Sequence, residues 1–170
     1  MAPEPVAIRH AEPADVQAVL RLLRETVEAI PDAWYTPLQR ESWKALFTED
    51  ALAGLLQRQA QPQGLTHALV VEDASRMMAF ACLAGDEVKM LYVHPSAQGT
   101  GLGGQLLTQL ETEARRRGVS RLRLRASANA LGFYKGRGYA RDLGNASSAT
   151  GSTSCDCGGQ VLCTWLAKTL

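Results

Sequence analysis

Hydrophobic and polar residues follow a helical period over the first third of the chain. Apolar residues recur three and four positions apart, which predicts an amphipathic helix that begins at Ala14 or Asp15 and ends near Ile30. The buried stripe of this helix should comprise Val16, Val19, Leu20, Leu23 and Val27. Two shorter helices are predicted next, the first from Pro37 or Leu38 and the second from Glu49. Their expected buried residues are Trp43, Leu46 and Phe47 in the first, and Leu52, Leu55 and Leu56 in the second.

The period is two in other parts of the chain, and this alternation is typical of strands. A first strand is predicted at residues 6–10, before the helices. Three strands at 66–71, 77–83 and 88–93 are separated by short turns, so they should form an antiparallel meander. The order of elements predicts an α/β (α+β) fold, in which helices flank both faces of a mixed, mostly antiparallel sheet.

The second half of the chain continues with alternating helices and strands. A long helix is predicted from Gln105, with Gly118 as its C-terminal stop. The further predicted elements are a strand at 121–127, a short helix at 129–135, a strand near Tyr139 and a final strand at 161–166. Between the last two strands, residues 144–159 are rich in Gly, Ser and Thr, which predicts a mobile loop.

A cluster of glycines separates the third strand of the meander from the long helix. Four glycines fall within the six residues 99–104, at the expected helix entrance. Backbone N–H groups of a first helical turn are unpaired and lie at the positive end of the helix dipole, so this segment is suited to bind a phosphate-like anion. The alternative is a flexible connection without a ligand.

Composition narrows the classes of protein further. The 170 residues suffice for one domain, residues 1–170, with its own core. A net charge of +1 gives no reason to expect nucleic acid or a membrane surface as partner. We expect a cytoplasmic protein, because residues 1–5 do not resemble a signal peptide and no apolar run is long enough to cross a membrane. The four cysteines, Cys82, Cys155, Cys157 and Cys163, should then be reduced.

Three local motifs in this order resemble the GNAT N-acetyltransferase superfamily over roughly residues 6–142. The segment 98–103, Gln-Gly-Thr-Gly-Leu-Gly, is similar to the pyrophosphate loop of that family. Residues 91–95, Leu-Tyr-Val-His-Pro, resemble the strand end that lines the pantetheine arm of acetyl-CoA. Residues 129–139 resemble the family's Asn-x-x-Ala-x-x-Phe-Tyr segment, apart from Gly132. The loop at 144–159 is not part of the shared pattern.

The resemblance implies acetyl-CoA as cosubstrate, without a metal, and assigns residues to it. Main-chain N–H groups would hold the pyrophosphate at Gln98, Gly99, Thr100, Gly101, Leu102, Gly103 and Gly104. The pantetheine arm would pair with an open strand edge at Leu91, Tyr92 and Val93, and Asn129 would bind its amides unless it caps a helix. In the family a β-bulge and a splayed strand make this room, and the N–H of Leu91 would stabilise the oxyanion.

The same resemblance suggests catalytic roles for two side chains. Tyr134 would be the general acid that protonates the departing thiolate; the alternative is a core tyrosine. Glu87 would be the general base, acting through water because it precedes Leu91 by roughly 13 Å of extended strand. Its alternative is an exposed carboxylate at the strand end. Asp86, Tyr92 and His94 are weaker candidates.

The acceptor side is expected between the first helices, where Trp34, Tyr35 and Trp43 would line a pocket, with packing in the core as the favoured alternative for Trp43. We expect a primary amine on a small molecule as substrate, with a protein lysine or N-terminus as the alternative. A homodimer stays open. Two other classes also stay open: a non-catalytic module that binds acetyl-CoA as a sensor, and an NADP-dependent oxidoreductase suggested by Gly-x-Gly-x-x-Gly at 99–104. Cys155, Cys157 and Cys163 lack the spacing of a zinc site.

Overall fold

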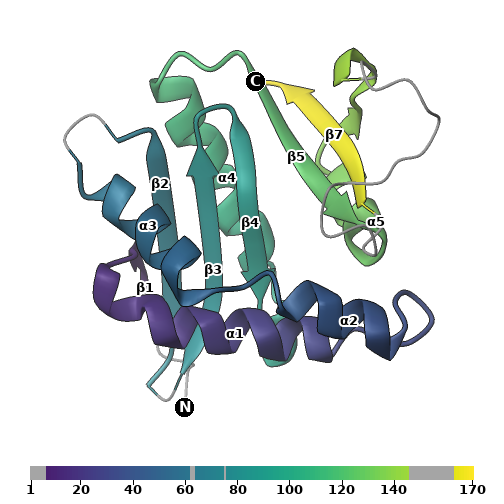
Figure 1. Ribbon diagram of the computed structural model, residues 1–170. Coiled ribbons are helices and arrows are strands. Elements are labelled where there is room, and N and C mark those ends of the chain that lie inside the picture. The colour runs from purple at the N-terminus through teal and green to yellow at the C-terminus, as the bar shows by residue number, and fades with distance from the viewer. Residues whose placement is uncertain (1–6, 62–63, 75, 146–162) are drawn as a thin grey trace.

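The protein is described here by a computed structural model that covers residues 7–61, 64–74, 76–145 and 163–170. Seven strands form one mixed sheet (Figure 1). In spatial order these are β1 (Ala7–His10), β2 (Thr66–Glu72), β3 (Met77–Ala84), β4 (Glu87–Val93), β5 (Arg121–Ser127), β7 (Cys163–Thr169) and β6 (Ala140–Arg141). All neighbours are antiparallel except β4 and β5, so the predicted mixed α/β sheet is confirmed.

Helices cover both faces of this sheet (Figure 1). Helices α1 (Val16–Glu28) and α3 (Glu49–Gln59) pack on β2 and β3, and α2 (Pro37–Lys44) lies against α1. On the opposite face α4 (Leu102–Arg116) packs on β3 and β4, and the short α5 (Leu131–Lys135) follows β5. Each face therefore has its own core: the apolar stripe of α1 fills one, and the leucines of α4 fill the other.

The pairing of β4 with its two neighbours is the feature that shapes the site. On one side, Cys82 pairs with Met90 but Leu83 pairs with Val88, so Lys89 is the extra residue of a β-bulge. On the other side, β4 and β5 pair only at Glu87–Arg123 and Val88–Leu124. Beyond Val88 the two parallel strands separate, and the main chain of β4 is left without a partner in β5.

Most element boundaries agree with the sequence prediction within a few residues. The predicted stripe of α1 is buried throughout. Helix α4 begins at Leu102 rather than Gln105, so Gly103 and Gly104 lie in its first turn instead of the loop before it. Leu46 is 44% exposed, because α2 ends at Lys44 and the chain turns before reaching it. The final strand begins at Cys163 among the described residues, and the predicted loop lies largely outside them.

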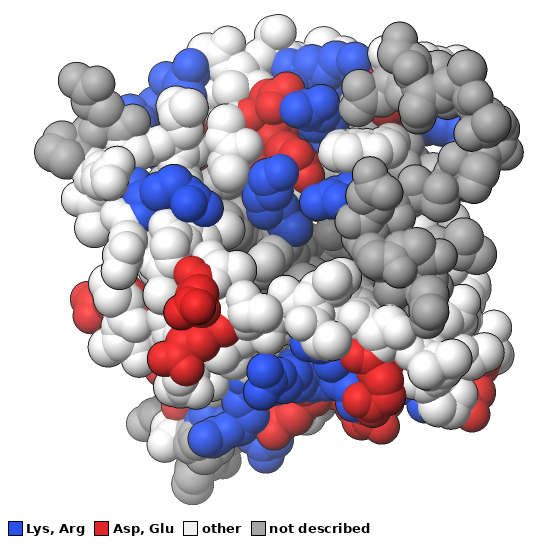
Figure 2. All heavy atoms as spheres, viewed as in Figure 1, with Lys and Arg blue, Asp and Glu red and all other residues white. Residues whose placement is uncertain are grey.

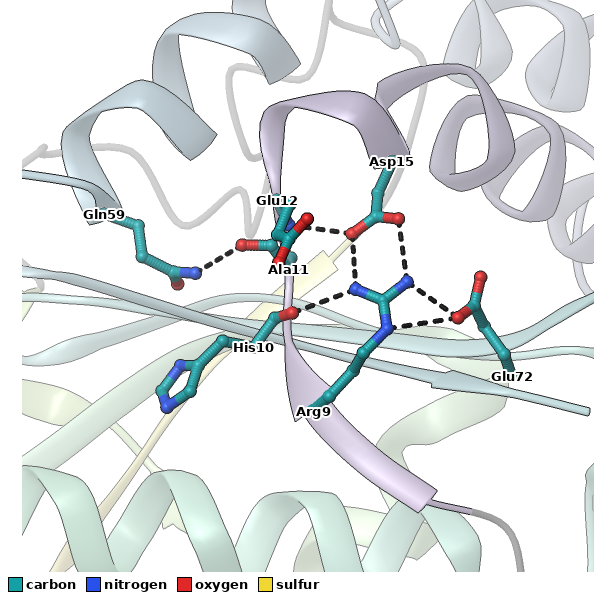
Figure 3. Close-up of polar contacts among 7 residues, drawn as sticks. All are labelled: Arg9, His10, Ala11, Glu12, Asp15, Gln59 and Glu72. Atoms are coloured by element: carbon teal, nitrogen blue, oxygen red, sulfur yellow. Dashed lines mark hydrogen bonds and ion pairs between the residues drawn. The ribbon is translucent and has the colours of Figure 1, made fainter.

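A partly buried ion pair fixes the joint between β1 and α1 (Figure 3). The Arg9 guanidinium donates from Nη1 and Nη2 to the Asp15 carboxylate over 2.8 and 2.9 Å, and Nη2 also reaches Glu72 at 2.7 Å. Asp15 additionally accepts from the backbone N–H of Glu12. A bidentate pair of this kind fixes orientation as well as distance, so it sets the angle at which α1 leaves the edge strand.

Two further sequence predictions concern cysteines and membranes. Cys82 is a free, buried thiol, whereas Cys163 is disulfide-bonded, which corrects the expectation that all four are reduced. Cys155 and Cys157 lie outside the described residues. Within the described ranges, no helix has the length and apolar character that crossing a membrane requires.

Candidate functional site

A cavity of about 630 Å³ opens where β4 and β5 separate. Its walls come from the loop before α4, the exposed edge of β4, the start of α5 and the helical segment around α2. On the face shown in Figure 2, the molecule is hollowed near the middle. The split in the sheet therefore creates a continuous space that connects the glycine segment with the helices on the other face.

The glycine segment forms the end of this cavity that suits an anion. Gly99 and Gly101 have φ values of 77° and 90°, which are unfavourable for residues with a side chain, and Gly101 is the N-cap of α4. The side-chain amide of Gln98 donates to the carbonyl of Val93 over 3.0 Å, which ties the segment to the end of β4. Among the predicted residues of this segment, those that line the cavity are Gln98, Gly99, Gly101, Gly103 and Gly104.

The other two residues of the segment have supporting positions. The Thr100 hydroxyl donates to the carbonyl of Ala97 over 2.7 Å, and Leu102 is buried in the core beneath α4. Neither side chain lines the cavity. Their contribution to anion binding would therefore come from the main chain and from the shape of the turn.

Arg137 also lines this end of the cavity, and the sequence analysis did not single it out. Its guanidinium lies 3.9 Å from the centroid of the Phe133 ring, and Nη1 donates to the carbonyl of Phe133. A Cβ atom at Gly104 would come within 2.6 Å of Nη2, so only glycine lets the cation lie against the first turn of α4. No carboxylate of the described residues pairs with Arg137, which leaves its charge available to an anion.

The unpaired edge of β4 presents main-chain groups to the cavity. The N–H of His94 donates to the carbonyl of Met78, which sets the alternation of the antiparallel pair with β3. By that alternation the main-chain N–H and C=O groups of Tyr92 and Met90 point toward β3. Those of Leu91 and Val93 therefore point into the gap toward β5. Leu91, Tyr92 and Val93 all line the cavity.

Tyr134 lines the same cavity and is 7% exposed. Its ring lies at steep angles between the rings of Phe133 and Tyr139, with centroid distances of 5.0 and 5.8 Å. Burial raises the pKa of the Tyr134 hydroxyl well above its usual value. The phenol therefore stays protonated over the whole neutral range, which is the form that a general acid needs.

Glu87 does not line the cavity, whereas its two cationic partners, Lys89 and Arg125, do. The carboxylate is 5% exposed and accepts from Lys89 Nζ over 2.6 Å, and Arg125 Nε lies 3.6 Å away. Glu87 is therefore not the exposed strand-end carboxylate of the alternative interpretation. It is also not placed to contact a substrate in the cavity directly. Two weaker candidates are engaged too: Asp86 pairs with Arg123, and His94 Nδ1 accepts from the N–H of Ser96.

Of the three aromatic residues expected at the acceptor pocket, Trp43 lines the cavity and Trp34 and Tyr35 do not. Trp43, Phe47 and Tyr92 line the cavity, and Trp43 and Phe47 pack edge to face on Tyr92. Trp34 is 53% exposed and does not line it. Tyr35 is buried outside the cavity, where its hydroxyl accepts from the N–H of Ala128 over 2.8 Å. This bond ties the turn before α2 to the turn that follows β5, so Tyr35 supports the wall from behind.

Asn129 lines the cavity between β5 and α5. The alternative interpretation made it a helix cap, but the N-cap residues here are Ser127 for the turn Ala128–Ala130 and Ala130 for α5. Asn129 therefore caps neither helix. Among the described residues, no cluster of His, Cys, Asp and Glu has the arrangement of a metal site.

Comparison with known proteins gives one family and several similar folds. Residues 26–155 match the model of the acetyltransferase (GNAT) domain. A segment of 74 residues is 40% identical to serotonin N-acetyltransferase 2, chloroplastic, from Oryza sativa subsp. japonica. That segment covers 41% of this chain and only 37% of the rice protein.

Two solved structures have the same fold over nearly the whole chain. A GCN5-related N-acetyltransferase from Rhodopseudomonas palustris is 28% identical, with a TM-score of 0.80 over 100% of this chain and 99% of the other. The PaiA N-acetyltransferase from Thermoplasma acidophilum, solved in complex with coenzyme A, is 17% identical with a TM-score of 0.77, covering 97% and 99% of the two chains.

Proposed function

The chain belongs to the GNAT acetyltransferase family, and on that premise we propose that it transfers the acetyl group of acetyl-CoA to a primary amine of a small molecule. The observation that carries the proposal is the split between β4 and β5. It leaves the main chain of Leu91 and Val93 facing a cavity that ends at the glycine segment and at Tyr134.

The described residues fit the binding of a CoA thioester in three places. The diphosphate would lie against the N–H groups of residues 99–104 at the entrance of α4, with Arg137 as the cation beside it. The pantetheine amides would bond the N–H and C=O of Leu91 and the N–H of Val93 as an added strand, since the Val93 carbonyl already accepts from Gln98. Asn129 would offer its side-chain amide from the opposite wall.

The residues around Leu91 and Tyr134 supply the groups that acetyl transfer needs. The amine nitrogen attacks the thioester carbonyl carbon, and the N–H of Leu91 stabilises the negative charge that develops on the oxygen. As the carbon–sulfur bond breaks, the Tyr134 hydroxyl donates its proton to the sulfur. The nitrogen, which is positively charged after the attack, releases one proton to water, and solvent returns one proton to Tyr134, so the products are the neutral N-acetylated amine and free CoA.

The amine must also lose a proton before it can attack. Glu87 was assigned this role through water, yet Lys89 and Arg125 already bind its carboxylate. These two cations favour the neutral form of a nearby amine, because a positive neighbour lowers the pKa of an ammonium group. We therefore propose Glu87 as a positioning residue for Lys89 and Arg125, with water as the proton acceptor.

Replacing Tyr134 by phenylalanine tests the proposal. Tyr134→Phe should lower kcat for amine acetylation by about 10²-fold or more, because general acid catalysis contributes on this scale. Affinity for acetyl-CoA, measured by calorimetry, should stay the same. Tyr139→Phe is the matched control: it removes a buried hydroxyl that donates to Glu111 over 3.0 Å, away from the cavity, and should keep kcat.

The outcome separates the enzyme from the other classes. Tight binding of acetyl-CoA without acetylation of any amine by the wild-type protein would indicate a binding module instead. An unchanged kcat in Tyr134→Phe would remove Tyr134 from the mechanism.

A further inference from the structure

The charged residues that line the cavity are all positive. Among the described lining residues, the charged side chains are Lys89, Arg125 and Arg137, and none is Asp or Glu. Figure 2 shows Lys and Arg side chains at the edge of the hollow on this face, with Asp and Glu next to them. A substrate that enters this cavity therefore meets cations at its walls.

The three cations lie at two different ends of the cavity. Arg137 lies against α4, where the diphosphate is proposed to bind. Lys89 is the bulge residue of β4, on the other side of Leu91. The parallel register of Val88 with Leu124 places Arg125 at the level of Lys89. Lys89 and Arg125 are thus separate from the anion site of the glycine segment, and besides pairing with Glu87 they line the cavity.

Lys89 retains hydrogen-bonding capacity toward the cavity. An ammonium group has three N–H donors, and Glu87 receives one of them over 2.6 Å. The Lys89 side chain is 38% exposed, whereas the Glu87 side chain is 7% exposed. The buried carboxylate therefore anchors Lys89 from behind, while the outer side of the ammonium faces the space in which the acceptor must arrive.

We infer that the acceptor is an amine that carries a carboxylate, and that Lys89, with Arg125 beside it, binds this carboxylate. The inference rests on the proposed acetyl transfer and names the substrate class for it. Charge-assisted hydrogen bonds to a carboxylate are the strong ones, so they would orient the acceptor with its amine toward Leu91. An acceptor with a second ammonium group would meet like charge at the same place.

Strand geometry sets the spacing between the two groups of the acceptor. Lys89 precedes Leu91 by two residues, which corresponds to about 7 Å of extended strand. The amine must reach the carbonyl held near Leu91 while the carboxylate lies near Lys89. A spacer of a few methylene groups spans this distance, and Trp43, Phe47 and Tyr92 offer an apolar wall to it.

Three amines with the same five-carbon chain test the inference: δ-aminovalerate, pentylamine and cadaverine. They place a negative, a neutral and a positive group at the same distance from the reacting nitrogen. With wild-type protein, kcat/KM for δ-aminovalerate should exceed that for pentylamine by about tenfold or more, the usual effect of one hydrogen-bonded charge pair. Cadaverine should be the poorest of the three.

Variants of Lys89 assign the preference to this side chain. Lys89→Met should reduce the ratio of kcat/KM for δ-aminovalerate to kcat/KM for pentylamine to about twofold, because one of two cations is removed. Lys89→Arg should restore it, and Lys89→Glu should favour cadaverine. Lys135→Met is the matched control, because this exposed lysine of α5 does not line the cavity.

Each outcome decides between the inference and the proposed function. Equal kcat/KM for the three amines in the wild type, or the same preference in Lys89→Met, would overturn the inference and leave acetyl transfer in place. Acetyl-CoA binding without acetylation of any amine would overturn the proposed function itself. Binding of acetyl-CoA, measured by calorimetry, shows whether each variant is folded. If a variant does not fold, the comparison of the three amines with the wild-type protein still tests the inference.

Discussion

Individual residues acquire their roles here from the contacts that surround them. Tyr134 and Tyr139 are both buried tyrosines, and burial raises the pKa of both hydroxyls. Tyr139 donates to Glu111, whereas Tyr134 lines the cavity. The same residue type is therefore structural at one position and a candidate acid at the other.

Arg137 provides a prediction at this scale. Arg137→Ala should weaken acetyl-CoA binding about tenfold, because it removes a charge-assisted contact from the proposed diphosphate site. Gly104→Ala should weaken binding as well, since its Cβ would come within 2.6 Å of Arg137 Nη2 and displace the cation. Calorimetry with acetyl-CoA gives both values.

A double-mutant cycle distinguishes this route from a direct effect of the methyl group. If Gly104→Ala acts through Arg137, the double variant should bind about as weakly as Arg137→Ala alone. Fully additive losses would contradict the proposed contact. Gly132→Ala is the control, because nothing lies within 4 Å of the Cβ it adds.

At the scale of elements, strand β4 shows how local irregularities make a site. The bulge at Lys89 and the loss of pairing with β5 after Val88 fall on successive residues. Together they open the sheet, turn Lys89 to the cavity and leave the N–H of Leu91 without a strand partner. A regular strand would have closed this space with ladder hydrogen bonds.

The joint between β1 and α1 yields a prediction on stability (Figure 3). Asp15→Asn keeps the shape but places an N–H donor against the Arg9 guanidinium, so it should lower the free energy of unfolding by about 2 kcal/mol. Denaturant unfolding measures the change. Glu41→Gln is the control: its carboxylate is 67% exposed and pairs with Lys44 on the surface of α2, and pairs of this kind contribute about 0–1 kcal/mol. Equal losses in the two variants would contradict the assigned importance of the joint.

At the scale of the whole molecule, three groups should make the fold sensitive to acid. Burial holds the pKa of His67 below its usual 6.5, so protonation favours the unfolded chain as the pH falls past that value. Hydrogen bonds from Arg9 lower the pKa of Asp15, and those from Arg116 and Arg117 lower the pKa of Glu113 to about 2. Carboxylates with lowered pKa values stabilise the fold above their unfolded values and lose this contribution in acid.

The melting temperature should therefore fall in two stages on acidification, first below pH 6.5 and then from about pH 4.5 downward. Scanning calorimetry over this range measures the profile. Glu113→Gln should flatten the second stage and deepen the first, because the Glu113 carboxylate partly offsets the lowering of the His67 pKa by burial. A melting temperature that rises on acidification would contradict the assignment of these groups.

Ligand binding also acts on the whole molecule. Acetyl-CoA should raise the melting temperature, since a ligand that binds only the folded state stabilises it by mass action. NADP(H) should not, because the open edge of β4 is proposed to pair with the pantetheine amides of CoA, which NADP(H) lacks. Stabilisation by NADP(H) alone would instead favour the dinucleotide interpretation of Gly-x-Gly-x-x-Gly.

The sequence by itself determined the elements of the fold and the family. The periods of apolar residues located α1, α3 and the β2–β4 meander, because these patterns depend on residues close together in the chain. The glycines before α4 indicated an anion site for the same reason, since φ values and helix ends are local properties.

Only the tertiary structure decided which side chains face the cavity. Arg137 approaches Gly104 from a segment more than thirty positions away, and the hydroxyl of Tyr35 bonds Ala128 instead of a substrate. Glu87 lies behind Lys89 because a bulge in β4 shifts the alternation of side chains. Such contacts depend on strand register and on packing between distant segments, which hydrophobic period and local motifs do not encode.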